Sequence, residues 1–160
     1  MKKIRIGVMG VGRGSSMINY CEQANHAEVV AICDKWEEGI ARQKALHNDG
    51  RITYYHDFDS VACYNNFEDF FKHDMDAVVL ANYANEHAPF AIRAMEAGKH
   101  VFSEVLPVQT PAQAVELVEA VERTGKIYAY GENYCYMPYC QQIRQMVRKK
   151  AHRAREHYIP

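Results

Sequence analysis

Residues 4–15, with the sequence IRIGVMGVGRGS, decide the fold of this chain. An apolar run suited to a buried strand leads into a glycine-rich turn, and a helical pattern follows it. Gly10 permits a tight turn between strand and helix, and Gly12 lets a pyrophosphate group approach the backbone. The free N–H groups and the positive dipole end of the helix then face the phosphates. This stretch therefore predicts a dinucleotide site.

The third glycine of this motif is expected at position 15, where the chain has a serine. Gly14 stands one position early. Because serine is small, we expect Ser15 to allow the close packing of helix on strand that a third glycine would provide. The motif is thus imperfect, and its strand–turn–helix setting carries the prediction.

An acidic residue follows the second apolar run at the spacing that a dinucleotide site requires. Asp34 lies 22 residues after Gly12, where a carboxylate accepts hydrogen bonds from the adenosine ribose hydroxyls. Because a carboxylate repels a 2′-phosphate, we expect NAD as the cofactor in preference to NADP, although the adjacent Lys35 keeps NADP from being excluded. The alternative role for Asp34 is to cap the helix expected from Trp36 onward.

Short apolar runs alternate with longer amphipathic stretches along the chain, which is typical of a parallel sheet covered by helices. The expected strands are Ile4–Met9, Glu28–Cys33, Ala77–Ala81, His100–Ser103 and Ile127–Tyr130. The expected helices are Ser15–Ala24, Trp36–His47, Phe67–His73, Glu86–Ala97, Pro111–Thr124 and Tyr139–Lys150. Ile52–Tyr55 is a candidate short strand, and the rest of residues 48–66 reads as loop. We predict an α/β fold with a doubly wound, mostly parallel Rossmann sheet and helices on both faces.

Polar residues come directly after the expected strands. Open parallel sheets bind ligands outside the carboxyl ends of their strands. The five strand ends are marked by Gly10, Asp34, Asn82, Glu104 and the pair Glu132-Asn133. Any one of these residues could be only a cap or turn residue, but together they favour a ligand site at one sheet edge. His87 belongs either to this edge or to the surface.

Composition and charge exclude several other function classes. The formal net charge of the 160 residues is −1, so no overall field attracts nucleic acid or an anionic membrane, and we expect neither as a partner. The apolar runs are too short for a transmembrane helix. The five cysteines form no C-x-x-C pair, which favours free thiols in the cytoplasm. The segments His56–Asp59 and His73–Asp76 contain ligand-type residues but lie far apart, and we expect no metal.

These motifs together resemble the glucose–fructose oxidoreductase / inositol dehydrogenase / MocA family. The resemblance runs from about residue 3 to residue 148, through Gly10-x-Gly12, Asp34, the block GKHVFSE of residues 98–104 and the later Glu132-Asn133. It implies hydride transfer between NAD(P) and a hydroxyl of a sugar, cyclitol or related small molecule. By position, it implies dinucleotide or nicotinamide contacts by Gly10, Gly12, Arg13, Asp34, Asn82, His87, Glu104 and Asn133.

The chain departs from the family in its catalytic signature. Family members carry Glu-Lys-Pro, and the lysine helps to transfer the proton of the reacting hydroxyl; here Val105 follows Glu104. Valine transfers no proton, so the catalytic group stays unassigned. Ser103-Glu104-Val105 and the segment ENYCY of residues 132–136 resemble NAD-dependent glycosidases that act on α-N-acetylgalactosaminides by oxidation, elimination and reduction. That glycosidase and a non-catalytic dinucleotide-binding module are the alternatives to an oxidoreductase.

The resemblance also implies a two-domain parent enzyme. Residues 1–136 would form the NAD(P)-binding domain, and residues 137–160 a linker helix and the start of a truncated second, α+β substrate domain that this chain lacks. We therefore expect the chain alone to bind NAD(H) with poor turnover, and the full-length parent to bind a small sugar-like substrate. Apolar surface left without the second domain should drive self-association, so we expect a homo-oligomer.

Overall fold

The computed structural model describes residues 2–55 and 57–156. The strands within these residues form one parallel sheet in the order β3-β2-β1-β4-β5-β6. They are β1 (Ile4–Met9), β2 (Ala27–Cys33), β3 (Ala62–Tyr64), β4 (Ala77–Leu80), β5 (His100–Ser103) and β6 (Tyr128–Tyr130). The strand order reverses between β1 and β4, which is the doubly wound Rossmann topology. The predicted fold class is therefore confirmed.

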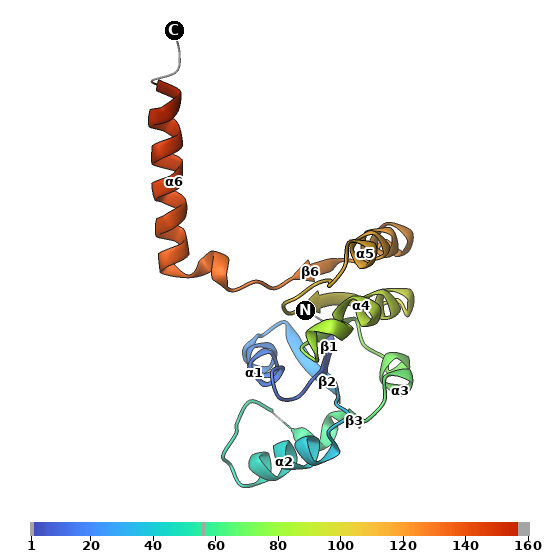
Figure 1. Ribbon diagram of the computed structural model, residues 1–160. Helices are drawn as coiled ribbons and strands as arrows, with labels where there is room; N and C mark the ends of the chain where they lie inside the picture. Colours follow the sequence, from blue (N-terminus) through green and yellow to red (C-terminus); the bar gives the residue numbers. More distant parts are fainter. Residues whose placement is uncertain (1, 56, 157–160) are drawn as a thin grey trace.

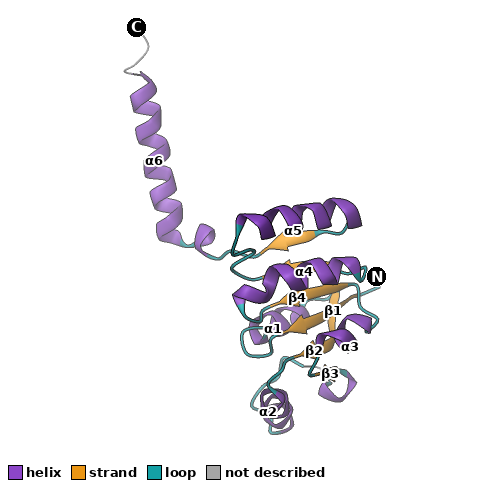
Figure 2. Ribbon diagram, turned by 45° about the vertical axis from the view of Figure 1, so that its right-hand side comes forward, coloured by secondary structure: helices purple, strands orange, loops and turns teal. Residues whose placement is uncertain are grey.

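Helices cover both faces of this sheet. They are α1 (Ser15–Gln23), α2 (Glu37–Asn48), α3 (Phe67–Lys72), α4 (His87–Glu96), α5 (Pro111–Thr124) and α6 (Pro138–Glu156), with short 3₁₀ turns η1 (Phe58–Ser60), η2 (Ala84–Glu86) and η3 (Tyr134–Tyr136). Figures 1 and 2 show α1 on one face of the sheet, α3, α4 and α5 on the other, and α6 standing away from both. Of the helices in the described part of the chain, none is both long and apolar enough to cross a membrane.

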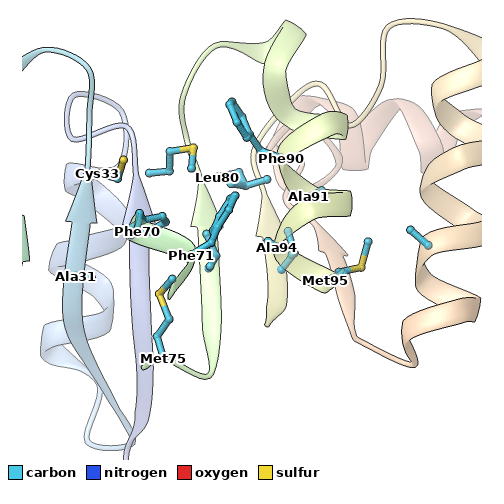
Figure 3. Close-up of a cluster of buried hydrophobic side chains, with 14 of the residues drawn as sticks. Ala31, Cys33, Phe70, Phe71, Met75, Leu80, Phe90, Ala91, Ala94 and Met95 are labelled. Carbon is cyan, nitrogen blue, oxygen red and sulfur yellow. The ribbon is translucent and has the colours of Figure 1, made fainter. Parts of the chain in front are cut away.

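The larger part of the core lies between the sheet and α3, α4 and α5. Phe70 and Phe71 from α3 and Phe90 from α4 pack over β1 and β4, as Figure 3 shows. Gly7 in β1 makes this packing possible, because a Cβ atom there would lie 2.3 Å from Met75 Sδ and 2.8 Å from a Phe70 ring carbon. The absence of a side chain at Gly7 thus brings α3 close to the strand that leads into the glycine turn.

The second part of the core lies on the face covered by α1 and α2. It joins Val8, Ile32 and Ile18 to Tyr55 and Phe58 from the loop before β3. The rings of Tyr55 and Phe58 lie edge to face with their centroids 4.7 Å apart. The carboxyl-terminal residues of β1 and β2 are buried, so the core on both faces of the sheet positions the turns that follow these strands.

One predicted element is wrong. Ile52–Tyr55 is not a strand, and the third strand is β3, which the sequence analysis assigned to loop. β3 is only three residues long and lies at the sheet edge, paired with β2 alone through the contacts Ala31–Ala62 to Cys33–Tyr64. Its apolar run, residues 61–64, is only four residues long, too short for its pattern to separate a strand from a loop. The aromatic ring of Tyr55 is buried in the core, but the backbone that carries it is irregular.

Candidate cofactor-binding cleft

A cleft of about 300 Å³ opens at the carboxyl ends of β1, β2 and β4. It lies where the strand order reverses, which is where open α/β sheets bind their ligands. Its walls are formed by Met9, Gly10, Gly12, Arg13, Cys33, Asp34, Lys35, Trp36, Phe67, Ala81, Asn82, Tyr83 and Glu86. The structure thus brings together five of the eight residues predicted to bind the cofactor: Gly10, Gly12, Arg13, Asp34 and Asn82.

The glycine turn forms the floor of the cleft. Gly10 has φ +92°, and a Cβ atom there would lie 2.4 Å from the carbonyl oxygen of Ala81. Gly12 has no atom within 4 Å of such a Cβ position, so its backbone faces open space. The turn therefore packs tightly against the end of β4 at Gly10 and leaves room for a ligand at Gly12.

The prediction that Ser15 makes the close contact between helix and strand is wrong: Gly14 makes it. A Cβ atom on Gly14 would lie 2.4 Å from the Gly10 carbonyl oxygen and 2.6 Å from Val8 Cγ1. Gly14 is the N-cap of α1, and Ser15 is the first helical residue, whose hydroxyl donates to the Gly12 carbonyl at 3.0 Å. The tight helix–strand contact of this turn is therefore made one residue earlier than the motif spacing predicts.

Asp34 is held at the cleft by two backbone donors. Its Oδ2 accepts a hydrogen bond from the Val11 N–H at 2.9 Å, and its Oδ1 accepts one from the Trp36 N–H at 2.9 Å. The second bond supports the turn before α2, although the N-cap residue of that helix is Trp36 itself. Because a carboxylate offers about four lone-pair sites, acceptor capacity remains for ribose hydroxyls.

Asn82 offers an unpaired acceptor beside the glycine turn. Its amide nitrogen donates to Glu86 Oε2 at 3.0 Å, while its Oδ1 is buried and has no partner among the described residues. Leaving a buried acceptor unpaired is unfavourable by about 1–3 kcal/mol. The Asn82 side chain is therefore suited to receive a donor from a bound molecule.

His87 has no exposed surface and is not among the residues that line the cleft. Its Nδ1 faces the Leu106 carbonyl oxygen at 2.9 Å, and its Nε2 faces the Asn82 carbonyl oxygen at 3.2 Å. The alternative of a surface histidine is therefore wrong. In this conformation His87 joins the turn after β4 to the segment after β5 and exposes no atom to a ligand.

The ends of β5 and β6 lie outside the walls of the cleft. Glu104, after β5, faces it through an ion pair between its Oε1 and Arg13 Nη2 at 3.5 Å. Glu132, after β6, accepts hydrogen bonds from the Tyr134 N–H at 2.8 Å and the Tyr130 hydroxyl at 3.1 Å, which build its own turn. Asn133 is not among the residues that line the cleft. Of the five strand ends expected at the ligand site, three, those of β1, β2 and β4, line the cleft, and Glu104 lies beside them.

Two aromatic side chains and one ion pair of the cleft were not predicted from the sequence. Trp36 is 50% exposed and Tyr83 is 78% exposed, so both rings are open to a planar ligand. Lys35 Nζ lies 3.2 Å from Glu86 Oε1 and 5.0 Å from the ring centroid of Phe67. The signal in the sequence that could have identified these two aromatic residues is their position, since Trp36 and Tyr83 follow residues at strand ends. The direction of each side chain, however, depends on the turn.

Cys33 lines the cleft with a buried, uncharged side chain. Burial raises the pKa of its thiol to about 12, so the thiol is neutral at pH 7. All five cysteines are free. Within the described ranges, no three His, Cys, Asp or Glu side chains gather in a way that could hold a metal ion. His56 of the segment His56–Asp59 lies outside the described residues.

Comparison with known proteins assigns the sequence to one family of enzymes. Residues 4–132 match the family model of the Gfo/Idh/MocA oxidoreductases, described as an oxidoreductase family with an NAD-binding Rossmann fold. A glycosyl hydrolase family 109 protein from Shewanella sp. strain ANA-3 is 33% identical over 138 residues, which are 85% of this chain and 30% of that protein. An alpha-N-acetylgalactosaminidase from Shewanella oneidensis is 30% identical over 148 residues, with the same coverage. The chain thus spans about 30% of the length of the curated relatives it matches.

Solved structures share the fold at lower sequence identity. The WlbA dehydrogenase from Bordetella pertussis, solved with NADH and UDP-GlcNAcA, superposes with a TM-score of 0.72 at 24% identity. Scyllo-inositol dehydrogenase from Lactobacillus casei, solved with NAD(H) and scyllo-inositol, superposes with a TM-score of 0.72 at 20% identity. Each match covers 92% of this chain and 42% of the other chain.

Proposed function

This chain belongs to the Gfo/Idh/MocA oxidoreductase family with its NAD-binding Rossmann fold, and from that membership we propose that the cleft holds NAD(H) in preference to NADP(H). We propose further that the whole enzyme transfers a hydride between NAD and a hydroxyl of a sugar- or cyclitol-like substrate. Hydride exchange is the chemistry that the nicotinamide supplies when bound. Residues 1–136 would form the dinucleotide-binding domain, and residues 137–160 the passage to a substrate domain.

The shape of the cleft supports a dinucleotide. The open space at Gly12 would accommodate a pyrophosphate, and the N-terminus of α1 beside it would present backbone N–H donors to that group. Arg13 adds a cation at the same place. The unpaired Oδ1 of Asn82 would accept a hydrogen bond from the bound molecule. His87 would act as a positioning residue, because it fixes the backbone on which Asn82 stands.

Glu104 and Asn133 would frame the nicotinamide end of the bound molecule. An ion pair joins Glu104 to Arg13 of the glycine turn, so Glu104 lies beside the cleft. The next residue, Val105, carries no group that could donate or accept a proton. A proton-transferring group would therefore have to come from elsewhere in the whole enzyme.

The single observation that carries the cofactor assignment is the placement of Asp34. Its carboxylate lies at the carboxyl end of β2, fixed by the N–H of the glycine turn, with capacity left for ribose hydroxyls. A 2′-phosphate in the same place would meet this negative charge. NADH is therefore the favoured dinucleotide.

Titration of NADH and NADPH against the wild type and Asp34→Ala tests this assignment. We expect the wild type to bind NADH more tightly than NADPH. Loss of hydrogen bonds to a charged acceptor should weaken NADH binding to Asp34→Ala by roughly tenfold or more and narrow the preference. Asp59→Ala is the matched control, because it removes an equal charge from an ion pair with Lys44 outside the cleft. Equal affinities in all four pairs of protein and dinucleotide would contradict the role of Asp34.

A second candidate activity is glycoside cleavage by oxidation, elimination and reduction. It is favoured by the relatives named as family 109 glycosyl hydrolases and by the sequence Ser103-Glu104-Val105, which lacks the family lysine. Product analysis of the whole enzyme separates the two activities. A glycosidase cleaves its substrate without net formation of NADH, whereas a dehydrogenase accumulates NADH with the oxidised sugar. A non-catalytic module does neither.

A further inference from the structure

The cations that line the cleft are each paired with a glutamate. They are Arg13, which pairs with Glu104, and Lys35, which pairs with Glu86. Lys35 is the more informative of the two, because it directly follows Asp34 and so stands beside the place of the adenosine ribose. A cation in that place can accommodate a 2′-phosphate.

Glu86 holds this lysine and also joins two strand ends. One carboxylate oxygen, Oε1, lies 3.2 Å from Lys35 Nζ, and the other, Oε2, accepts a hydrogen bond from the Asn82 amide at 3.0 Å. The Glu86 side chain is only 25% exposed, whereas that of Lys35 is 63% exposed. The carboxylate is therefore the fixed partner, anchored at the end of β4, and it draws the flexible lysine toward itself.

The ring of Phe67 limits the lysine further. Lys35 Nζ lies 5.0 Å from the centroid of this ring, within the range of a cation–π interaction. Glu86 and Phe67 together thus engage the charge of Lys35 before any ligand arrives. A 2′-phosphate, which carries close to two negative charges at neutral pH, would have to compete with Glu86 for it.

We propose that Glu86 is a specificity-determining residue that disfavours NADP(H) by keeping Lys35 paired. This inference rests on the proposed function, since it assumes that the cleft binds a dinucleotide. Asp34 and Glu86 then act in different ways. Asp34 accepts hydrogen bonds from the ribose hydroxyls of NAD, whereas Glu86 keeps Lys35 from pairing with the 2′-phosphate of NADP.

Substitution of Glu86 isolates this effect. Glu86→Gln keeps a side-chain amide able to hydrogen-bond Asn82, but it removes the charge that holds Lys35. We expect the affinity for NADPH, relative to that for NADH, to rise by about fivefold. Glu86→Asp provides a second variant, because a side chain one methylene shorter keeps the charge but weakens its simultaneous contact with Lys35 and Asn82; it should show part of the same gain.

The experiment measures dissociation constants of NADH and NADPH by fluorescence titration for the wild type, both Glu86 variants and the double variant Glu86→Gln/Lys35→Gln. The gain in NADPH affinity should disappear in the double variant, because the freed lysine is its source. Glu68→Gln is the matched control: it removes an equal charge from an ion pair with Arg93 outside the cleft and should leave both affinities unchanged.

Two results would overturn the inference and leave the proposed function standing. The first is an unchanged NADPH-to-NADH ratio in both Glu86 variants when the wild type binds NADH. The second is a gain that persists in the double variant, since Lys35 would then play no part. A wild type that binds neither dinucleotide would overturn the proposed function itself, and with it the role of Glu86.

Discussion

Gly10 and Gly12 stand two residues apart in one turn, yet an added methyl group would meet opposite surroundings. At Gly10 it meets the Ala81 carbonyl oxygen at 2.4 Å on backbone with φ +92°, whereas at Gly12 it meets open space. We expect Gly10→Ala to lower the free energy of unfolding by more than about 1 kcal/mol. We expect Gly12→Ala to stay within about 0.5 kcal/mol of the wild type in stability, but to lose NADH affinity by about tenfold or more, since its methyl occupies the approach of the pyrophosphate.

Urea unfolding and NADH titration of the two variants check this separation of folding from binding. The two variants serve as controls for each other, because each adds the same methyl group to the same turn. Gly12→Ala with wild-type NADH affinity would show that the dinucleotide does not approach the turn at this point.

Single residues differ in how far the sequence reveals them. Asp34 lies at the cleft, as its distance along the chain from the glycine turn, through one helix and one strand, predicts. The contact of Gly14 with Gly10, the burial of His87 and the pairing of Glu86 with Lys35 depend instead on neighbours brought close by folding. Such neighbours leave no periodic trace in the sequence.

At the scale of elements, a hydrogen bond and ion pairs join the amino ends of β1 and β4. The Arg5 N–H donates to Asp76 Oδ2 at 2.8 Å, and the Arg5 guanidinium pairs with Asp74. The backbone hydrogen bond from Arg5, assisted by the guanidinium charge, lowers the pKa of the Asp76 carboxyl. These central strands carry the glycine turn and Asn82 at their other ends, so the contact supports the cleft indirectly.

The lowered pKa of Asp76 predicts how stability depends on pH. Because the unfolded pKa is about 3.9 and the folded pKa is lower, the carboxylate stabilises the fold above pH 4. This contribution is lost as the pH falls through the folded pKa. We expect Asp76→Asn to be less stable than the wild type at pH 7 and the difference to shrink below about pH 4. Urea unfolding from pH 3 to pH 7 measures it; a difference that stays constant over this range would contradict the assignment.

Elements that bury apolar residues at a regular period were predicted well, whereas the short edge strand β3 was not. The boundaries predicted for β1, β5 and α5 agree with the structure, because each buries apolar residues at a regular period against its neighbours. β3 has only β2 beside it and too few residues to show a period. Its place was therefore fixed by pairing across the sheet, which sequence reasoning about single segments does not capture.

At the scale of the whole molecule, α6 is the element least joined to the rest. Figures 1 and 2 show it projecting from the body that the sheet and the other helices form. Tyr139, Ile143, Met146 and Val147 recur at helical spacing along it, and each is more than half exposed. Because the body packs its own two-sided core without α6, we propose that residues 1–136 hold the fold and that α6 supplies an association surface.

We expect this row of apolar side chains to drive self-association of the chain, with a second copy as the partner. Two charges in the row, in the variant Ile143→Glu/Val147→Glu, should lower the average mass measured by light scattering across a concentration series. NADH affinity should not change, since the cleft contains no residue of α6. Val118→Glu on α5 is the matched control, because its side chain is 57% exposed, as is that of Ile143, but lies on the body. A wild type that stays a monodisperse monomer at every concentration would contradict the prediction, because an exposed row of this kind would then have no affinity for a second copy.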